Sequence, residues 1–551
     1  MVPAPVRRQA GAQSAVIADR WPLSEGNCDE ATLFALSVVF SVSLPTLCAG
    51  ATPEEQAVVA KVDELLAESW ETNEIQPAPP ASDAEFLRRA WLDLCGIIPP
   101  INDADGISGI YSFLQNDSPD KREQMIVALL NKPRHATHFA NVWKNVMLPP
   151  EVNVLRFGGG NGFEGWLRGR FADNTPYDDV VREILTATGA ANQAGPALYY
   201  SALQLKPEEL AASTSRIFLG TQIQCAQCHD HPFDHWKREE FWGYAAFFAR
   251  LQQNPRAGQV MLQVTEANTG EVMIPGTDEI VRPRFLKGGM SSGGSSISRR
   301  TRLADWLTAA DNEWFARATV NRVWGLLFGR GIVDPVDDIG AHNPPSHPEL
   351  LDMLSQDFAQ SGFDLNRLIR ILTMTRAWQL SSESTADEHA DVMFARMAIK
   401  SLTAEQLYDC LAEAMRRREG VGPTQNRVFA ARGINPNRAA FLAKFRAPTQ
   451  GATEYEAGIP QALTLMNGAD VRQATDLSQS DLLVSLQAPF FTNERRVEVL
   501  FLSTLSRLPN EPERVRFVEY VEQGGTTNDS RAALSDVLWA LLNSAEFILN
   551  H

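Results

Sequence analysis

Two cysteines and three histidines lie close together in the sequence CAQCHDHPFDHW, as Cys225, Cys228, His229, His231 and His235. The first five residues match C-x-x-C-H, the pattern of covalent c-type haem attachment. In that chemistry two thiols add to the haem vinyl groups and the adjacent histidine ligates the iron. The pattern therefore predicts haem c bound through Cys225, Cys228 and His229, and a redox protein that transfers electrons.

The same side chains allow two other interpretations. Zinc or non-haem iron could be bound by His229, His231 and His235, with Cys225 and Cys228 as alternative ligands, in a metal protein able to carry out hydrolysis. The ligands are close in sequence and a proline separates two of them, so a closed tetrahedral site would need a distant ligand as well. In the third interpretation Cys225 and Cys228 form a structural pair in a cell-surface binding or scaffold protein. The sequence does not decide whether the chain is an enzyme.

The surroundings of the motif do not choose between these interpretations. A sixth ligand to haem iron would decide between electron transfer and ligand binding, and the nearby candidates are His231, His235, Met261 and Met273. Aromatic side chains are dense here: Phe233, Trp236, Phe241, Trp242, Tyr244, Phe247 and Phe248. Their spacing favours a helix that faces the protein core, although a haem would also need an apolar wall.

A second group of acids and histidines follows the Gly329-Arg330-Gly331 turn, and it comprises Asp334, Asp337, Asp338, His342 and His347. Carboxylates and imidazoles at this density could bind a metal or act as acids and bases. A structural account is favoured, because aspartate is common in turns. The sequence Ser346-His347-Pro348-Glu349 also predicts a capping box, which places His347 at the start of a helix.

The elements that position these groups are mainly α-helical. Apolar residues recur with a period of about 3.6 residues over most of the chain, which predicts amphipathic helices. We expect helices over residues 58–70, 84–94, 122–130, 177–188, 302–310, 314–329, 348–360, 364–375, 404–417, 497–505 and 533–547.

The pattern changes between residues 256 and 298. Alternating apolar residues predict a small β-hairpin or β insertion near residues 258–285, with Asn268-Thr269-Gly270 as its turn. The stretch GGMSSGGSSIS resembles a flexible linker. We therefore predict a leader, two helical domains and a β segment between them, with bounds 1–51, 53–255, 256–298 and 299–551.

The N-terminal region predicts export. Residues Ala31–Leu47 have the length and composition of a signal-peptide apolar core, and Ala49-Gly50-Ala51 provides a cleavage site. Cleavage after Ala51 gives a mature chain that starts TPEEQ, in the periplasm or outside the cell. The mature chain contains no apolar run long enough to span a membrane.

Composition restricts the partners. The formal net charge is −17, which repels phosphate backbones, and no basic patch with aromatic residues offsets it. Nucleic acid is therefore not expected as a partner, whereas a redox partner or another exported protein is compatible with the sequence.

Longer stretches resemble a known pair of families. The passage SRIFLGTQIQCAQCHDHPFDHWKREEFWGYAAFFAR, with FLRRAWLDLCGIIPP before it, resembles the planctomycete-specific cytochrome-like family of unknown function. Cys95 replaces a threonine of that family's signature, so no role is transferred to this thiol. The stretches RLADWLTAADNEWFARATVNRVWGLLFGRGIVDPVDDIG and LLNSAEFILNH resemble the planctomycete-specific C-terminal partner domain, also of unknown function. The cytochrome name refers to the same C-x-x-C-H residues, so it adds no independent support for haem.

Overall fold

The structure is a computed structural model of the chain. It describes residues 50–149, 161–190, 195–253, 263–289, 297–383, 389–415, 436–445, 466 and 468–551. The predicted signal segment at residues 31–47 lies outside the described residues, as does most of the predicted linker. Residues Cys48–His551 form one compact unit. Within the described residues no helix combines the length and the apolar character needed to cross a bilayer.

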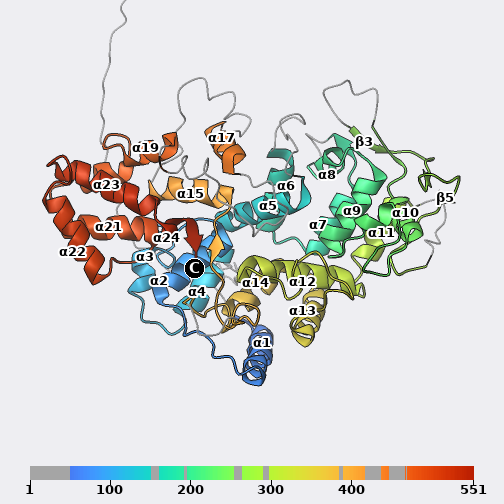
Figure 1. Cartoon of the computed structure of the whole chain (residues 1–551), viewed down its shortest axis with the longest axis horizontal. Helices are drawn as coiled ribbons and strands as arrows, with labels where there is room; N and C mark the ends of the chain where they lie inside the picture. The colour runs from blue at the N-terminus through green and yellow to red at the C-terminus, as the bar shows by residue number, and fades with distance from the viewer. Residues whose placement is uncertain are drawn as a thin grey trace, which may run out of the picture. The chain divides into compact units, whose positions relative to one another are not determined.

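Helices make up most of the described chain, which confirms the mainly α-helical fold class with small β insertions. In the first half they are α1 (Pro53–Thr72), α2 (Asp83–Cys95), α3 (Ile110–Leu114), α4 (Lys121–Leu130), α5 (Pro133–Met147), α6 (Asn161–Ala172), α7 (Tyr177–Thr186), α8 (Ala197–Ala202), α9 (Pro207–Phe218), the 3-10 helix η2 (Gln224–Gln227) and α10 (Arg238–Ala245). Figure 1 shows them in blue to green.

The second half continues with helices drawn in yellow-green to red in Figure 1. They are α11 (Arg299–Leu307), α12 (Glu313–Phe328), α13 (Pro348–Gln360), α14 (Leu365–Met374), α15 (Ala404–Ala414), α17 (Pro436–Phe445), α19 (Ala469–Thr475), α20 (Asp481–Leu486), α21 (Asn493–Leu505), α22 (Glu511–Glu522), α23 (Ser530–Leu542) and α24 (Ala545–Ile548). The predicted helix over 533–547 is two helices, because the Ser544 side chain caps a new one.

The strands are short: β1 (Gly189–Ala190), β2 (Leu251–Gln253), β3 (Gln263–Glu266), β4 (Val272–Met273), β5 (Ile280–Val281), β6 (Lys400–Ser401) and β7 (Leu549–Asn550). The β insertion is confirmed, but the predicted turn at Asn268-Thr269-Gly270 was wrong. It does not join two paired strands, since β3 pairs antiparallel with β1 and β2, whereas β4 pairs with β5. The predicted division into two helical domains stays a prediction.

One predicted helix cap was also wrong. α13 begins at Pro348, as expected, but His347 occupies the N-cap and no side chain caps this end. The Ser346 hydroxyl donates instead to the carbonyl of Ile332 at 3.0 Å. The loop before α13 therefore uses this hydroxyl to fix its own path, which leaves no capping box.

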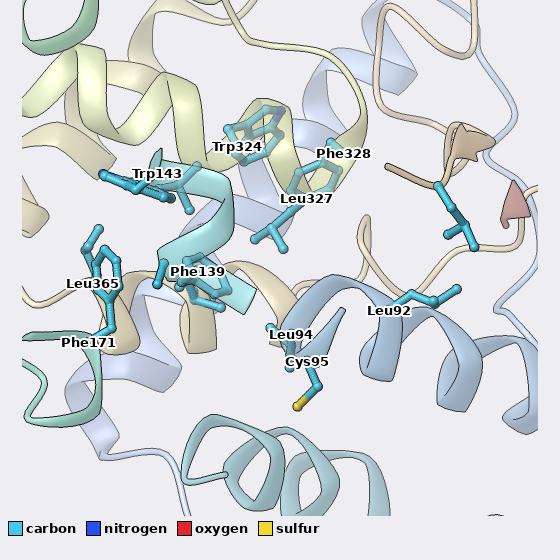
Figure 2. Close-up of a cluster of buried hydrophobic side chains, with 14 of the residues drawn as sticks. Leu92, Leu94, Cys95, Phe139, Trp143, Phe171, Trp324, Leu327, Phe328 and Leu365 are labelled. Atoms are coloured by element: carbon cyan, nitrogen blue, oxygen red, sulfur yellow. The ribbon is translucent and has the colours of Figure 1, made fainter. Parts of the chain in front are cut away.

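A single core joins helices from both halves. Figure 2 shows buried side chains of α2, α5, α6, α12 and α14 in one cluster, with Leu92, Leu94, Cys95, Phe139, Trp143, Phe171, Trp324, Leu327, Phe328 and Leu365 labelled. Each fully buried side chain of this size stabilises the fold by about 1.5–3 kcal/mol. The thiol of Cys95 is buried in this core, and burial raises its pKa to about 12. Cys95 therefore stays neutral and packs like a small apolar residue.

The C-terminal segment closes on α2, as Figure 1 shows near the label C. The Arg88 guanidinium is 1% exposed and donates to the carbonyl oxygens of Thr504, Glu546, Phe547 and Leu549 at 2.9–3.2 Å. These bonds satisfy acceptors left over at the ends of α21 and α24. One buried side chain thus connects α2 to two segments more than 400 residues later.

His138 on α5 is expected to make the fold sensitive to acid. Burial, with the nearby charge of Arg134, lowers the pKa of His138 to about 3. Below pH 6.5 the unfolded chain therefore binds a proton at His138 that the folded chain does not bind. The free energy of unfolding is highest above pH 6.5 and decreases as the pH falls below that value. We expect His138 to account for about 2 kcal/mol of lost stability between pH 6.5 and pH 5. Urea unfolding at several pH values tests this, and an unchanged pH slope in His138→Gln would contradict it.

Candidate functional site

The two cysteines of the motif lie on one exposed turn. After α9 the chain passes Gly220, whose φ is +62°, and enters η2, where the Cys228 amide donates to the Cys225 carbonyl at 3.5 Å. Both thiols are free and exposed. They differ from Cys95 and Cys410, which are buried in the core. The turn therefore presents two accessible thiols from one short segment, as attachment chemistry requires.

His229 has the hydrogen bond of a metal-binding histidine. Its ring is exposed, and Nδ1 lies 2.7 Å from the carbonyl oxygen of Asp230. Because a carbonyl oxygen only accepts, Nδ1 must carry the proton in this contact, and the lone pair of the neutral ring is then on Nε2. Metal-ligating histidines are commonly oriented in this way. In this ring state Nε2 of His229 is the nitrogen that could bind a metal.

His231 has the opposite arrangement. Its Nδ1 accepts from the amides of Asp234 at 2.9 Å and Phe233 at 3.3 Å. An amide only donates, so Nδ1 holds the lone pair and Nε2 carries the proton in the neutral ring. The His231 amide donates to the Trp236 carbonyl at 2.8 Å. The ring therefore shapes the loop and offers no free lone pair to a metal.

His235 pairs with a nearly buried carboxylate. Oδ1 of Asp234, whose side chain is 3% exposed, accepts from the His235 amide at 2.7 Å and from its Nδ1 at 2.5 Å. Burial raises the pKa of Asp234, but hydrogen bonds from His235 and the charges of His235 and His342 outweigh it, and the net direction is downward. Asp234 is therefore a carboxylate that orients His235, with the lone pair of the neutral ring on Nε2.

The acids of the second predicted cluster do not form one site. Asp334 lies 3.7 Å from Arg330, Asp337 lies 2.8 Å from Arg216 of α9, and Asp338 lies 3.2 Å from Nε2 of His342. The turn directs these three carboxylates to different partners.

His347 lies apart from these acids. Its Nε2 is 3.1 Å from the Ser69 hydroxyl of α1, and burial lowers its pKa. His347 is therefore part of the packing between α1 and α13.

His342 brings the two sequence clusters together. Its Nδ1 lies 3.8 Å from Oδ2 of Asp234 while Nε2 faces Asp338, and its ring centre is 6.3 Å from that of His231. Sequence reasoning considered His342 only as a member of the second cluster and did not consider Asp234. The sequence feature that accompanies this contact is the glycine at position 340. A Cβ atom there would lie 2.8 Å from Oδ2 of Asp234, so a larger residue would disturb the contact.

The aromatic residues after the motif belong mainly to the core. Trp236, Phe241, Trp242, Tyr244, Phe247 and Phe248 are all buried, as the favoured interpretation expected. Phe233 is the exception at 79% exposed. Of the sixth-ligand candidates, Met273 is exposed on β4, and Met261 lies outside the described residues. Phe233 is therefore an exposed apolar side chain close in sequence to the two exposed thiols.

The donor set fits haem attachment better than a closed metal site. Two free thiols and one histidine with an available Nε2 are the groups that c-type attachment uses. Over the described ranges no cluster of three or more His, Cys, Asp or Glu side chains is placed to hold a metal ion.

Two families of unknown function match the chain in tandem. PSCyt2, described as a protein of unknown function (DUF1549), matches residues 61–253, which include the Cys225–His235 cluster. PSD1, described as a protein of unknown function (DUF1553), matches residues 299–521, which include Asp334 and His342. The predicted tandem is thereby confirmed. No curated protein and no solved structure matches the chain.

Proposed function

We propose that this chain, a PSCyt2 region followed by a PSD1 region, is an exported c-type haem protein that exchanges electrons with a redox partner. Cys225 and Cys228 are the attachment thiols and His229 is the iron ligand. The observation that carries the proposal is their shared exposed turn, on which His229 donates through Nδ1 to Asp230 and leaves Nε2 free. When bound, the haem supplies one-electron chemistry.

The residues of the chain have separate roles in this proposal. The Asp230 carbonyl orients the His229 ring and fixes its tautomer. His231 accepts two loop amides and thereby holds the segment after the motif in a compact turn. Buried aromatic residues such as Trp236 anchor the turn on the core.

Export supports the haem interpretation. The apolar segment at residues 31–47 and the small residues before Thr52 are typical of a cleaved signal peptide. Attachment of haem to C-x-x-C-H takes place outside the cytoplasm, so the proposed location and the proposed cofactor agree.

The two alternatives have less support. A zinc or iron site formed by Cys225, Cys228, His231 and His235 would need a different ring state of His231, whose Nδ1 already accepts two amides. A scaffold role would rely on a Cys225–Cys228 disulfide, and it gives no function to the oriented ring of His229.

The test is a visible spectrum and an intact mass of the chain produced in a host that matures c-type cytochromes. We expect a sharp α-band in the reduced-minus-oxidised spectrum and a mass raised by one haem, both lost in Cys225→Ala/Cys228→Ala. Cys410→Ala, which removes a buried thiol, serves as the matched control and should keep both signals. A colourless protein of unmodified mass, beside a correctly matured control cytochrome, would refute the proposal, and elemental analysis would then test for zinc or iron.

A further inference from the structure

The segment at residues 337–342 contacts the chain just before the cysteine turn. The Ile339 amide donates to the Gly220 carbonyl at 2.7 Å. Asp337 accepts from Arg216 at 2.8 Å and from Gln222 at 3.3 Å. Gln222 precedes Cys225 by only three residues, so these bonds fix the point at which the turn begins.

The same segment contacts the chain just after the turn. Nδ1 of His342 lies 3.8 Å from Oδ2 of Asp234, the nearly buried carboxylate that also orients His235. Gly340 allows this approach, because a Cβ atom there would lie 2.7 Å from Cε1 of His342 and 2.8 Å from the Asp234 oxygen. On the other side, Asp338 holds His342 through Nε2 at 3.2 Å. The chain after the turn therefore packs against His342, which Asp338 holds in place, and Gly340 leaves room for this contact.

Both ends of the motif loop are thus held by one segment that belongs to the PSD1 match, whereas the motif belongs to the PSCyt2 match. A surface loop held at both ends has fewer conformations to lose when its side chains must adopt one geometry. Precise placement of a metal ligand depends on such supporting contacts.

We infer that residues 337–342 form a clamp on the loop that carries the Cys225–His229 turn, and that His342 is a positioning residue for the end of this loop at Asp234. The inference deepens the proposed function and rests on it for the role of His229. In this inference the PSD1 region supports the cysteine motif of the PSCyt2 region. His342 touches neither the thiols nor His229, and it contacts the loop at Asp234.

Hydrogen exchange in the full-length chain without haem tests the clamp separately from the cofactor. In His342→Ala we expect the amides of Phe233 and Asp234 to exchange about tenfold faster, which corresponds to a loss of about 1.4 kcal/mol of local stability. His342→Gln, which keeps an N–H donor, should restore much of the protection. Asp334→Asn is the matched control, because Asp334 is an acid of the same turn that pairs with Arg330. Exchange within twofold of wild type in His342→Ala would overturn the inference.

Two further measurements keep the test decisive. If His342→Ala does not fold, Gly340→Ala separates the same groups by steric conflict, and the same increase in exchange is expected. In the haem-loaded chain, His342→Ala should shift the midpoint potential while Asp334→Asn leaves it unchanged, and equal potentials in both variants would refute an effect of the clamp on the haem-binding turn. A chain that never acquires haem would refute the proposed function but would leave the exchange result standing.

Discussion

His229→Asn is expected to keep the covalently attached haem and to lose the spectrum of the native iron centre. The two thioether bonds depend on Cys225 and Cys228, so the intact mass stays raised by one haem. Asparagine cannot replace Nε2 as a strong iron ligand, so the sharp α-band of the reduced protein should disappear. Visible absorption and intact mass of the same sample give both readouts.

The same substitution at His231 is the matched control. Asparagine places a side-chain oxygen near the position of Nδ1, and it accepts amides two and three residues later in common turns. His231→Asn should therefore preserve the loop and leave the α-band at the wild-type wavelength. Loss of the band in His231→Asn with its retention in His229→Asn would show that the tautomer argument assigned the ligand to the wrong histidine.

Lys400→Met is expected to be strongly destabilising. Lys400 donates to Asp93 at 2.7 Å and to the carbonyls of Leu326 and Leu327 at the end of α12. Burial lowers the pKa of Lys400 and raises that of Asp93, while the charge of each partner acts in the opposite direction on the other. Removing one partner leaves a buried carboxylate without a counter-charge, at a cost of about 3–5 kcal/mol.

Urea unfolding measures this change as a shift of the midpoint. Lys61→Met is the matched control, because Lys61 pairs with Glu64 in an exposed salt bridge, where such pairs contribute less than about 1 kcal/mol. A double change that also replaces Asp93 with asparagine should recover part of the loss, since Asn550 can still donate to that side chain. Equal midpoints for Lys400→Met and Lys61→Met would refute the expected importance of the buried pair.

Much of the helical structure follows from local periodicity. The 3.6-residue pattern over 348–360 and 364–375 predicts α13 and α14, because each helix buries one apolar face. The errors occurred where local signals compete with distant partners. The position of Ser346 before α13 predicts a helix cap, but its hydroxyl donates a hydrogen bond to the Ile332 carbonyl instead. The residues Asn268-Thr269-Gly270 predict a hairpin turn, but the strand before them, β3, pairs with β1 and β2 and not with the strand that follows.

The candidate site was predictable in its composition and not in its arrangement. The C-x-x-C-H spacing identifies Cys225, Cys228 and His229 directly. Nothing in the spacing of the histidines indicates that His229 and His231 hold their ring protons on opposite nitrogens, because that depends on which backbone groups face each ring. The contact between Asp234 and His342 also depends on tertiary packing across more than 100 residues of sequence.

The bonds of Arg88 have a consequence for the order of folding. The ribosome completes α2 early, but 461 residues separate Arg88 from Leu549, one of its acceptors. Until the residues around Leu549 are synthesised, the Arg88 guanidinium lacks most of the carbonyl oxygens to which it donates hydrogen bonds. The packing around α2 is then incomplete. Domains normally fold in the order in which they emerge during synthesis. This chain must instead wait for the segment around Leu549 before the polar contacts of α2 are complete.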